Sequence, residues 1–130
     1  MLNKLLFIAA GGAIGAVLRF GTTVWVSKLT TGPFPIGTLA VNLIGCFLIG
    51  LIWEADAFIS VPVELRFFLI AGFLGAFTTF SAYSIETFNL FREGHYWPAL
   101  GGILLSNAGC ILMTFGGVMI SKMIFGVKGI

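Results

Sequence analysis

The sequence predicts an all-α membrane protein with four transmembrane helices. Of its 130 residues, 58% are hydrophobic and 9% are charged, whereas about a quarter of a soluble protein is charged. Four long apolar stretches are separated by short polar connections, and in lipid such stretches are helical unless they close a barrel. The predicted single domain, 1–130, has approximate spans at residues 5–27, 36–53, 66–90 and 96–121.

The first two spans differ in the polar residues they carry. The first is apolar except for Arg19 and is too long for a cleaved signal peptide, so we expect it in the mature chain. The second carries Thr38 and Asn42, which are four residues apart and therefore share a helix face. Hydrocarbon cannot satisfy the amide of Asn42. This side chain is expected to contact a helix, water or an ion.

The third span contains the stretch GAFTTFSAY, residues 75–83, which is unusual for a membrane helix. Gly75 and the pair Thr78 and Thr79 favour an interruption near the middle of the span, which lipid tolerates only where it is buried or lines a cavity. Freed carbonyls suit a hard cation such as sodium, and a freed helix N-terminus suits an anion. Phe80 and Tyr83 place two rings on one face, either as positive ring edges for an anion or as simple packing.

The fourth span carries a second polar stripe. Ser106 and Cys110 are four residues apart, and Asn107 lies beside them. Cys46 and Cys110 both lie in apolar runs without CxxC spacing, so we expect packing residues and not a disulfide framework or a metal site.

The 18 glycines recur at spacings typical of closely packed membrane helices. They predict a tight bundle. A bundle of four such short helices is thin, which favours an oligomer as the functional unit.

The distribution of Lys and Arg gives only a weak orientation signal. One side of the predicted membrane holds Lys4, Arg66, Lys122 and Lys128, and the other holds Lys28 and Arg92. Because the Lys and Arg difference between short loops sets the direction of insertion, this bias permits both orientations, although a single orientation stays open. The net charge of +2 has no clustered basic face, so no nucleic-acid partner is expected.

Three motifs in order, GGAIGAVLRF (11–20), GTLAVNLIGCFLIG (37–50) and GAFTTFSAYSIET (75–87), resemble the Fluc fluoride channels, also called CrcB proteins. The resemblance covers nearly the whole chain. It implies an antiparallel, dual-topology homodimer in the bacterial inner (plasma) membrane, with two fluoride pores and a structural sodium ion on the two-fold axis. Such a channel exports cytoplasmic fluoride.

The resemblance also implies roles for individual residues. Backbone carbonyls of Gly75 and Thr78 are expected to bind sodium. The expected fluoride pathway comprises Asn42 as a donor, Phe80 and Tyr83 as an aromatic box, and Thr38, Ser81, Ser84, Ser106, Cys110, Glu86 and Arg19 along the track. Arg19 either concentrates anions near a pore entrance or anchors the helix at the interface, and Glu86 either handles ions or is an interfacial residue.

The chain departs from the family pattern at three positions. The family usually has Phe-Ser-Thr-Phe-Ser where this chain has Ala82 and Tyr83 as the third and fourth residues, and it commonly has a serine near Cys110. A hydroxyl is lost at the first of these positions and a phenol is gained at the second.

Two other classes of membrane protein remain as alternatives. A small multidrug exporter coupled to protons needs a titratable carboxylate deep in the bundle, and Glu86 is the one acid that adjoins the interior of a predicted span. A purely structural membrane subunit has no use for paired polar stripes. An enzyme is not expected, because His95 lies in a loop without partner groups.

Overall fold

A computed structural model describes residues 1–126 of the chain and has four helical spans. The elements are α1 (Leu2–Ser27), α2 (Ile36–Ile59), α3 (Val63–Arg66), the π-helix η1 (Phe67–Leu74), α4 (Gly75–Phe77), α5 (Phe80–Arg92), α6 (Tyr96–Leu104), the π-helix η2 (Leu105–Gly109) and α7 (Cys110–Phe125). Each span is long and apolar enough to cross a membrane. The all-α, four-span prediction is confirmed, and the chain is a multi-pass membrane protein; Lys128 lies outside the described residues.

Several helices run beyond the spans predicted from hydropathy. The second ends at Ile59 and not at Trp53, because its polar end is stabilised by contacts to neighbouring elements. The Asp56 carboxylate accepts hydrogen bonds from the backbone N–H of Val61, at 2.8 Å, and from the guanidinium of Arg66, at 2.7 Å. An acidic side chain thus closes the turn between the second and third spans.

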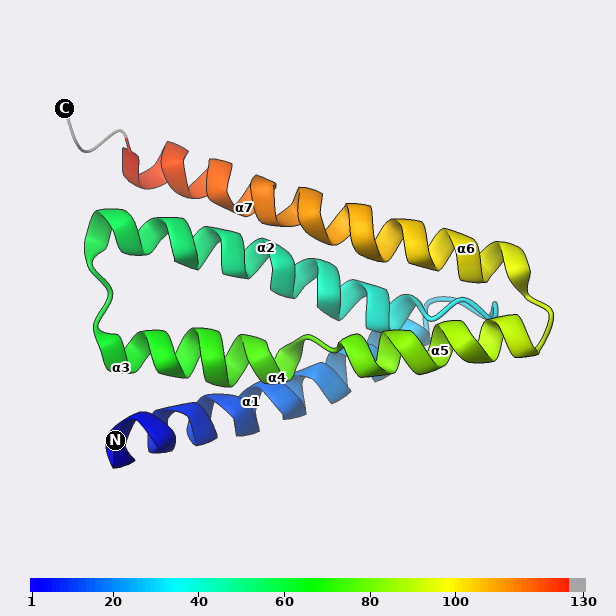
Figure 1. Ribbon diagram of the computed structural model, residues 1–130, viewed down its shortest axis with the longest axis horizontal. Coiled ribbons are helices and arrows are strands. Elements are labelled where there is room, and N and C mark those ends of the chain that lie inside the picture. Colours follow the sequence, from blue (N-terminus) through cyan, green and yellow to red (C-terminus); the bar gives the residue numbers. More distant parts are fainter. Residues whose placement is uncertain (127–130) are drawn as a thin grey trace.

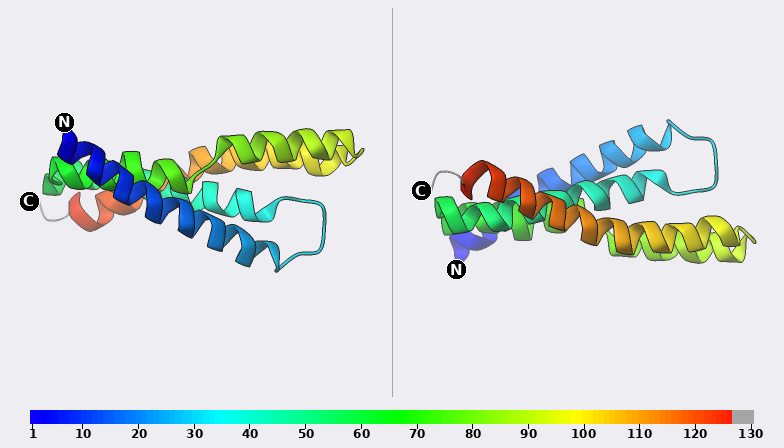
Figure 2. Two further views of the ribbon diagram at one scale, coloured as in Figure 1. Left: turned by 90° about the horizontal axis from the view of Figure 1, so that it is seen from below. Right: turned by 90° about the horizontal axis from the view of Figure 1, so that it is seen from above.

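The four spans are arranged in pairs (Figure 1). α1 packs along η1 and α4, α2 packs along α7, and α5 packs against α6. The N-terminus and the end of α7 lie at the same end of the molecule. At the opposite end the pair α1 and α2 diverges from the pair α5 and α6 (Figure 2). The third span therefore changes partners midway along its length.

Close helix packing at glycine confirms the role predicted for several of these residues. A Cβ atom at Gly50 would collide with the Thr114 carbonyl, and one at Gly117 would collide with the Phe47 carbonyl, so α2 and α7 touch backbone to backbone. Gly116 and Gly101 differ, because a Cβ atom there meets nothing within 4 Å.

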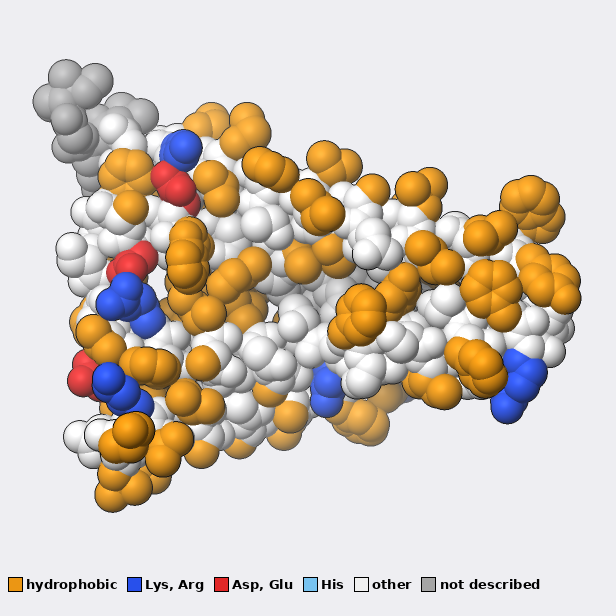
Figure 3. Space-filling model, in the orientation of Figure 1, with side chains coloured by type: hydrophobic (Ala, Val, Ile, Leu, Met, Phe, Trp, Pro, Cys, Tyr) orange, Lys and Arg blue, Asp and Glu red, His pale blue; other side chains and the backbone are white. Residues whose placement is uncertain are grey.

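The surface matches a lipid environment. Charged side chains gather at the end that holds α3, while apolar side chains cover the flanks of the spans (Figure 3). Phe20 is 72% exposed and Phe80 is 73% exposed in the isolated chain. Apolar surface of this extent requires lipid or another chain to cover it.

Adjacent glycines on α7 provide a matched test of the packing. We expect Gly117→Val to destabilise the protein by about 1–3 kcal/mol, because the added side chain pushes α7 off α2. Gly116→Val adds the same side chain to the same helix, but into open space. Its free energy of unfolding should therefore be close to that of the wild type. Unfolding in detergent titrated with dodecyl sulfate and followed by circular dichroism measures both; equal stability of the two variants would contradict the close contact.

Candidate functional site

The predicted interruption of the third span is present and lies at Thr78 and Thr79. Their backbones are extended, with φ −84° and ψ 155° at Thr78 and φ −150° and ψ 113° at Thr79. The Thr79 side chain then caps the next helix by accepting a hydrogen bond from the Ala82 N–H at 3.1 Å. A threonine in this position both ends one helix and starts another.

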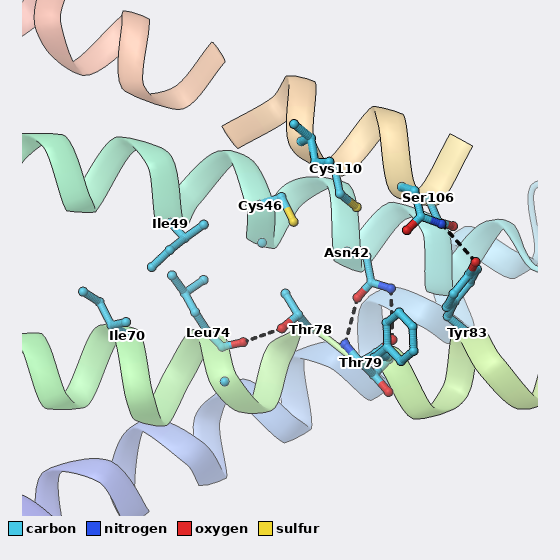
Figure 4. Close-up of a pocket in the computed structure, with 15 residues that line it drawn as sticks. Asn42, Cys46, Ile49, Ile70, Leu74, Thr78, Thr79, Tyr83, Ser106 and Cys110 are labelled. Atoms are coloured by element: carbon cyan, nitrogen blue, oxygen red, sulfur yellow. Dashed lines mark hydrogen bonds between the residues drawn. The ribbon is translucent and has the colours of Figure 1, made fainter. Parts of the chain in front are cut away.

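Asn42 holds the break from the second span (Figure 4). Its amide nitrogen donates to the Thr79 carbonyl at 3.0 Å, and its amide oxygen accepts from the Thr79 N–H at 2.8 Å. The side chain is 9% exposed. We call this pair of bonds the Asn42 clamp; the contact observed for Asn42 is with the backbone of the third span, at its break.

The break leaves carbonyls near the end of α4 without their helical partners, and those of Gly75 and Thr78 are among them. In a continuous helix the Thr79 N–H bonds the Gly75 carbonyl and the Ala82 N–H bonds the Thr78 carbonyl. Here these two N–H groups bond Asn42 and the Thr79 hydroxyl instead. The carbonyls of Gly75 and Thr78 are therefore available to another ligand.

A cavity of about 470 Å³ opens beside the break, and we call it the clamp cavity. Its lining comes from the second, third and fourth spans (Figure 4). The predicted site residues found in it are Asn42, Gly75, Thr78, Phe80, Tyr83, Ser106 and Cys110. None of the residues that line it is charged.

The two rings of the clamp cavity meet edge to face. The ring centroids of Phe80 and Tyr83 are 5.1 Å apart, with an angle of 62° between the planes. The Tyr83 hydroxyl accepts a hydrogen bond from the amide of Asn107 at 3.2 Å. The added phenol thus links the third span to the fourth.

Sequence analysis did not select Asn107 as a site residue, although it lines the clamp cavity. Sequence analysis placed Asn107 beside Ser106 and Cys110, and in a regular α-helix residues three apart, such as Asn107 and Cys110, already lie on one side. All three residues line the clamp cavity, from the π-helix η2 (Leu105–Gly109) and the first residue of α7. Thr79 was also missed as a site residue; the signal available was its place in the predicted break.

A second cavity lies on the other side of the break, and we call it the arginine cavity. The predicted residues that line it are Arg19, Thr38, Ser81 and Glu86. The Thr38 hydroxyl donates to one Glu86 carboxylate oxygen at 2.8 Å, while the other oxygen is buried without a partner among residues 1–126. Thr79 lines both cavities, and its hydroxyl lies 3.2 Å from that of Ser81.

Ser84 does not join either group. It is exposed and is not among the residues that line the two cavities. The other predicted pathway residues are divided between the two cavities, with the Asn42 clamp between them.

These features define a four-span membrane protein whose third helix is broken at a buried polar clamp between two cavities. Residues 6–118 match the family described as CrcB-like protein, Camphor Resistance (CrcB), and the chain belongs to this family.

Curated relatives cover nearly the whole chain. A protein of Salinibacter ruber is 45% identical over 88% of this chain and 93% of its own length. Another, of Methanocaldococcus jannaschii, is 41% identical over 96% of this chain and 99% of its own length. Both are named fluoride-specific ion channel FluC. Membership in a family of ion channels confirms that the chain is not an enzyme.

The Asn42 clamp can be tested without any assay of function. We expect Asn42→Ala to speed hydrogen exchange at Thr79 and neighbouring amides and to destabilise the protein, because a buried donor or acceptor left unpaired costs about 1–3 kcal/mol. Thr38→Ala removes a polar contact on the same helix face without touching the clamp. Hydrogen exchange read by mass spectrometry should separate the two variants; slow exchange at Thr79 in Asn42→Ala would contradict the clamp.

Proposed function

We propose that this protein is a fluoride-selective channel that exports cytoplasmic fluoride by passive, electrogenic flow. The observation that carries the proposal is the clamp cavity, whose polar lining consists of neutral amides, hydroxyls, thiols and ring edges without a carboxylate. Neutral donors bind a small anion and release it again more readily than a fixed cation does. The names of the curated relatives support fluoride as the ion.

Several groups in the clamp cavity suit an anion. The edges of the Phe80 and Tyr83 rings carry partial positive charge. The Asn42 amide has a second N–H beyond the one bonded to Thr79, and Ser106 supplies a hydroxyl.

We place one entrance of the proposed fluoride pathway in the arginine cavity. Arg19 places a cation there, and a cation with low-dielectric walls raises the local concentration of anions. Thr38 and Ser81 then offer hydroxyls between this entrance and the break.

We propose that the working unit is an antiparallel dual-topology homodimer with two pores, in the bacterial inner membrane. Phe80 is too exposed in one chain to enclose an ion, so a second chain is needed to cover its side chain. The weak Lys and Arg bias is compatible with insertion in both directions.

A sodium ion on the dimer axis is the proposed ligand of the Gly75 and Thr78 carbonyls. Both carbonyls lose their helical partners at the break, and an unpaired carbonyl in a membrane interior is costly. Two inverted copies bring both pairs of carbonyls together. Sodium is a hard cation that oxygen ligands suit, and it compensates all of them at once.

Glu86 is the observation that favours a second candidate, a proton-coupled exporter. One oxygen of its carboxylate is bonded to Thr38, and the other is buried without a partner within residues 1–126. A carboxylate in a membrane span is a functional-site hypothesis in its own right.

Fluoride flux from liposomes separates the two candidates. We expect the purified protein to release fluoride at symmetric pH when a potassium ionophore supplies counter-current, and to exclude chloride, because the clamp cavity has no group that must exchange a proton. A fluoride-selective electrode measures the release. Release that requires a proton gradient would support the exporter.

Two Asn→Asp substitutions, one at a residue that lines the clamp cavity and one away from both cavities, test the pathway. Asn42→Asp should abolish release, because it replaces the amide donors by acceptors next to the Thr79 carbonyl. Asn89→Asp makes the same chemical change away from the residues that line the two cavities and should conduct. Near-normal release from Asn42→Asp would remove this residue from the path.

Removal of sodium tests the role of the freed carbonyls. In rigorously sodium-free potassium or lithium buffer, we expect a weaker dimer, which dissociates already at protein concentrations where the sodium-bound dimer is intact, or a lower fluoride flux. The reason is that the carbonyls of Gly75 and Thr78 lose their ligand. Light scattering after size-exclusion chromatography measures the dimer, and sodium added back is the control. Unchanged dimer and flux would show that the carbonyls are satisfied within the protein.

A further inference from the structure

We propose that Cys46 and Cys110 form a two-sulfur site for a soft monovalent cation, copper(I) or silver(I). Cys46 lies on α2 and Cys110 is the first residue of α7. Both are free thiols, both are partly exposed, and both line the clamp cavity. Figure 4 shows their sulfur atoms on facing helices, directed toward the cavity.

The two thiols are held near one another by the helix packing around them. Both side chains line the same cavity, one from each of these two helices. One to two turns further along, Gly50 and Gly117 bring the backbones of α2 and α7 into contact, so this pair of helices is not free to separate. A preorganised pair of ligands loses little conformational entropy when a metal binds.

The donor set selects the class of metal. Thiolate sulfur is a soft ligand that prefers copper(I) and other soft ions. Structural zinc takes four ligands, and residues 1–126 contain no group of three or more His, Cys, Asp or Glu placed to hold a metal. Copper(I) and silver(I) are satisfied by two sulfur ligands, and the lining of the cavity includes two cysteines.

The apolar surroundings also determine the protonation of the bound site. One thiol loses its proton and forms a metal–sulfur bond as thiolate, while the other thiol donates a sulfur lone pair with its S–H bond intact. One proton leaves, no electron is transferred, and the monovalent cation with one thiolate is neutral. A neutral complex avoids the cost of a net charge among apolar side chains such as Ile49 and Ile111.

A bound ion would lie in the same cavity as Asn42 and Ser106. It would therefore obstruct the path for fluoride. This consequence rests on the proposed function, whereas the binding of the metal does not.

Binding is tested on the purified full-length protein in chloride-free nitrate buffer. We expect native mass spectrometry to show one silver ion per chain after addition of silver nitrate and removal of excess by a weak thioether competitor. Cys46→Ser and Cys110→Ser should each lose the ion, since one sulfur alone holds it weakly. Silver retained equally by either single variant, or no silver retained by the wild type, would overturn the two-sulfur site.

Oxidation gives a further outcome. If the wild type treated with hydrogen peroxide loses two hydrogens per chain and the reduced protein takes up no silver, the pair is a disulfide former and the metal site is wrong. If the reduced protein binds one silver ion that blocks this oxidation, the two thiols share one ligand, as proposed.

Flux measurements test the obstruction separately. Each protein is compared with its own fluoride release before silver is added. We expect silver nitrate to reduce fluoride release by the wild type to the level of protein-free liposomes, and excess dithiothreitol to restore that release. Silver nitrate should leave fluoride release by both single variants unchanged. Silver bound at the pair with undiminished flux would overturn the obstruction, whereas absence of any flux before silver would count against the proposed function and leave the binding result standing.

Discussion

The two hydrogen bonds between the Asn42 amide and the backbone of Thr79 are the contact on which the rest of the site depends. An unpaired N–H or C=O inside a membrane costs several kcal/mol, so a helix cannot stop in mid-span without substitutes for its own bonds. A primary amide supplies a donor and an acceptor at the spacing of one residue. With both Thr79 groups satisfied, the chain can leave the helix for two residues and begin α5 in a new direction.

The clamp works only if the second span is fixed relative to the third. Backbone contact at Gly50 and Gly117 fixes α2 against α7, and α1 packs on η1 and α4 before the break. Beyond the break α5 packs on α6 instead. The break is therefore the place where the third span passes from one partner to another, and a straight helix could not satisfy both.

Hydropathy and residue chemistry predicted the four spans, the interrupted third helix and the polar faces of the second and fourth spans. These features follow from local composition, because lipid imposes a strict rule on backbone bonding. The partner of Asn42 and the bond from Thr38 to Glu86 depend on how helices meet, which a single sequence does not specify. The π-helix η2 was missed for a related reason, since no residue within it signals a change of period.

The division of the site into two cavities has a physical consequence of its own. Arg19 and Glu86 line the cavity on one side of Thr79, and no Lys, Arg, Asp or Glu lines the cavity on the other side. The Arg19 cation attracts an anion over a longer range, whereas neutral donors distinguish ions at contact by size and hydrogen bonding. Under the proposed function, attraction and discrimination thus fall to different sides of one residue. Because Thr79 lines both cavities and its backbone is held by Asn42, the clamp that permits the break also fixes the wall between them.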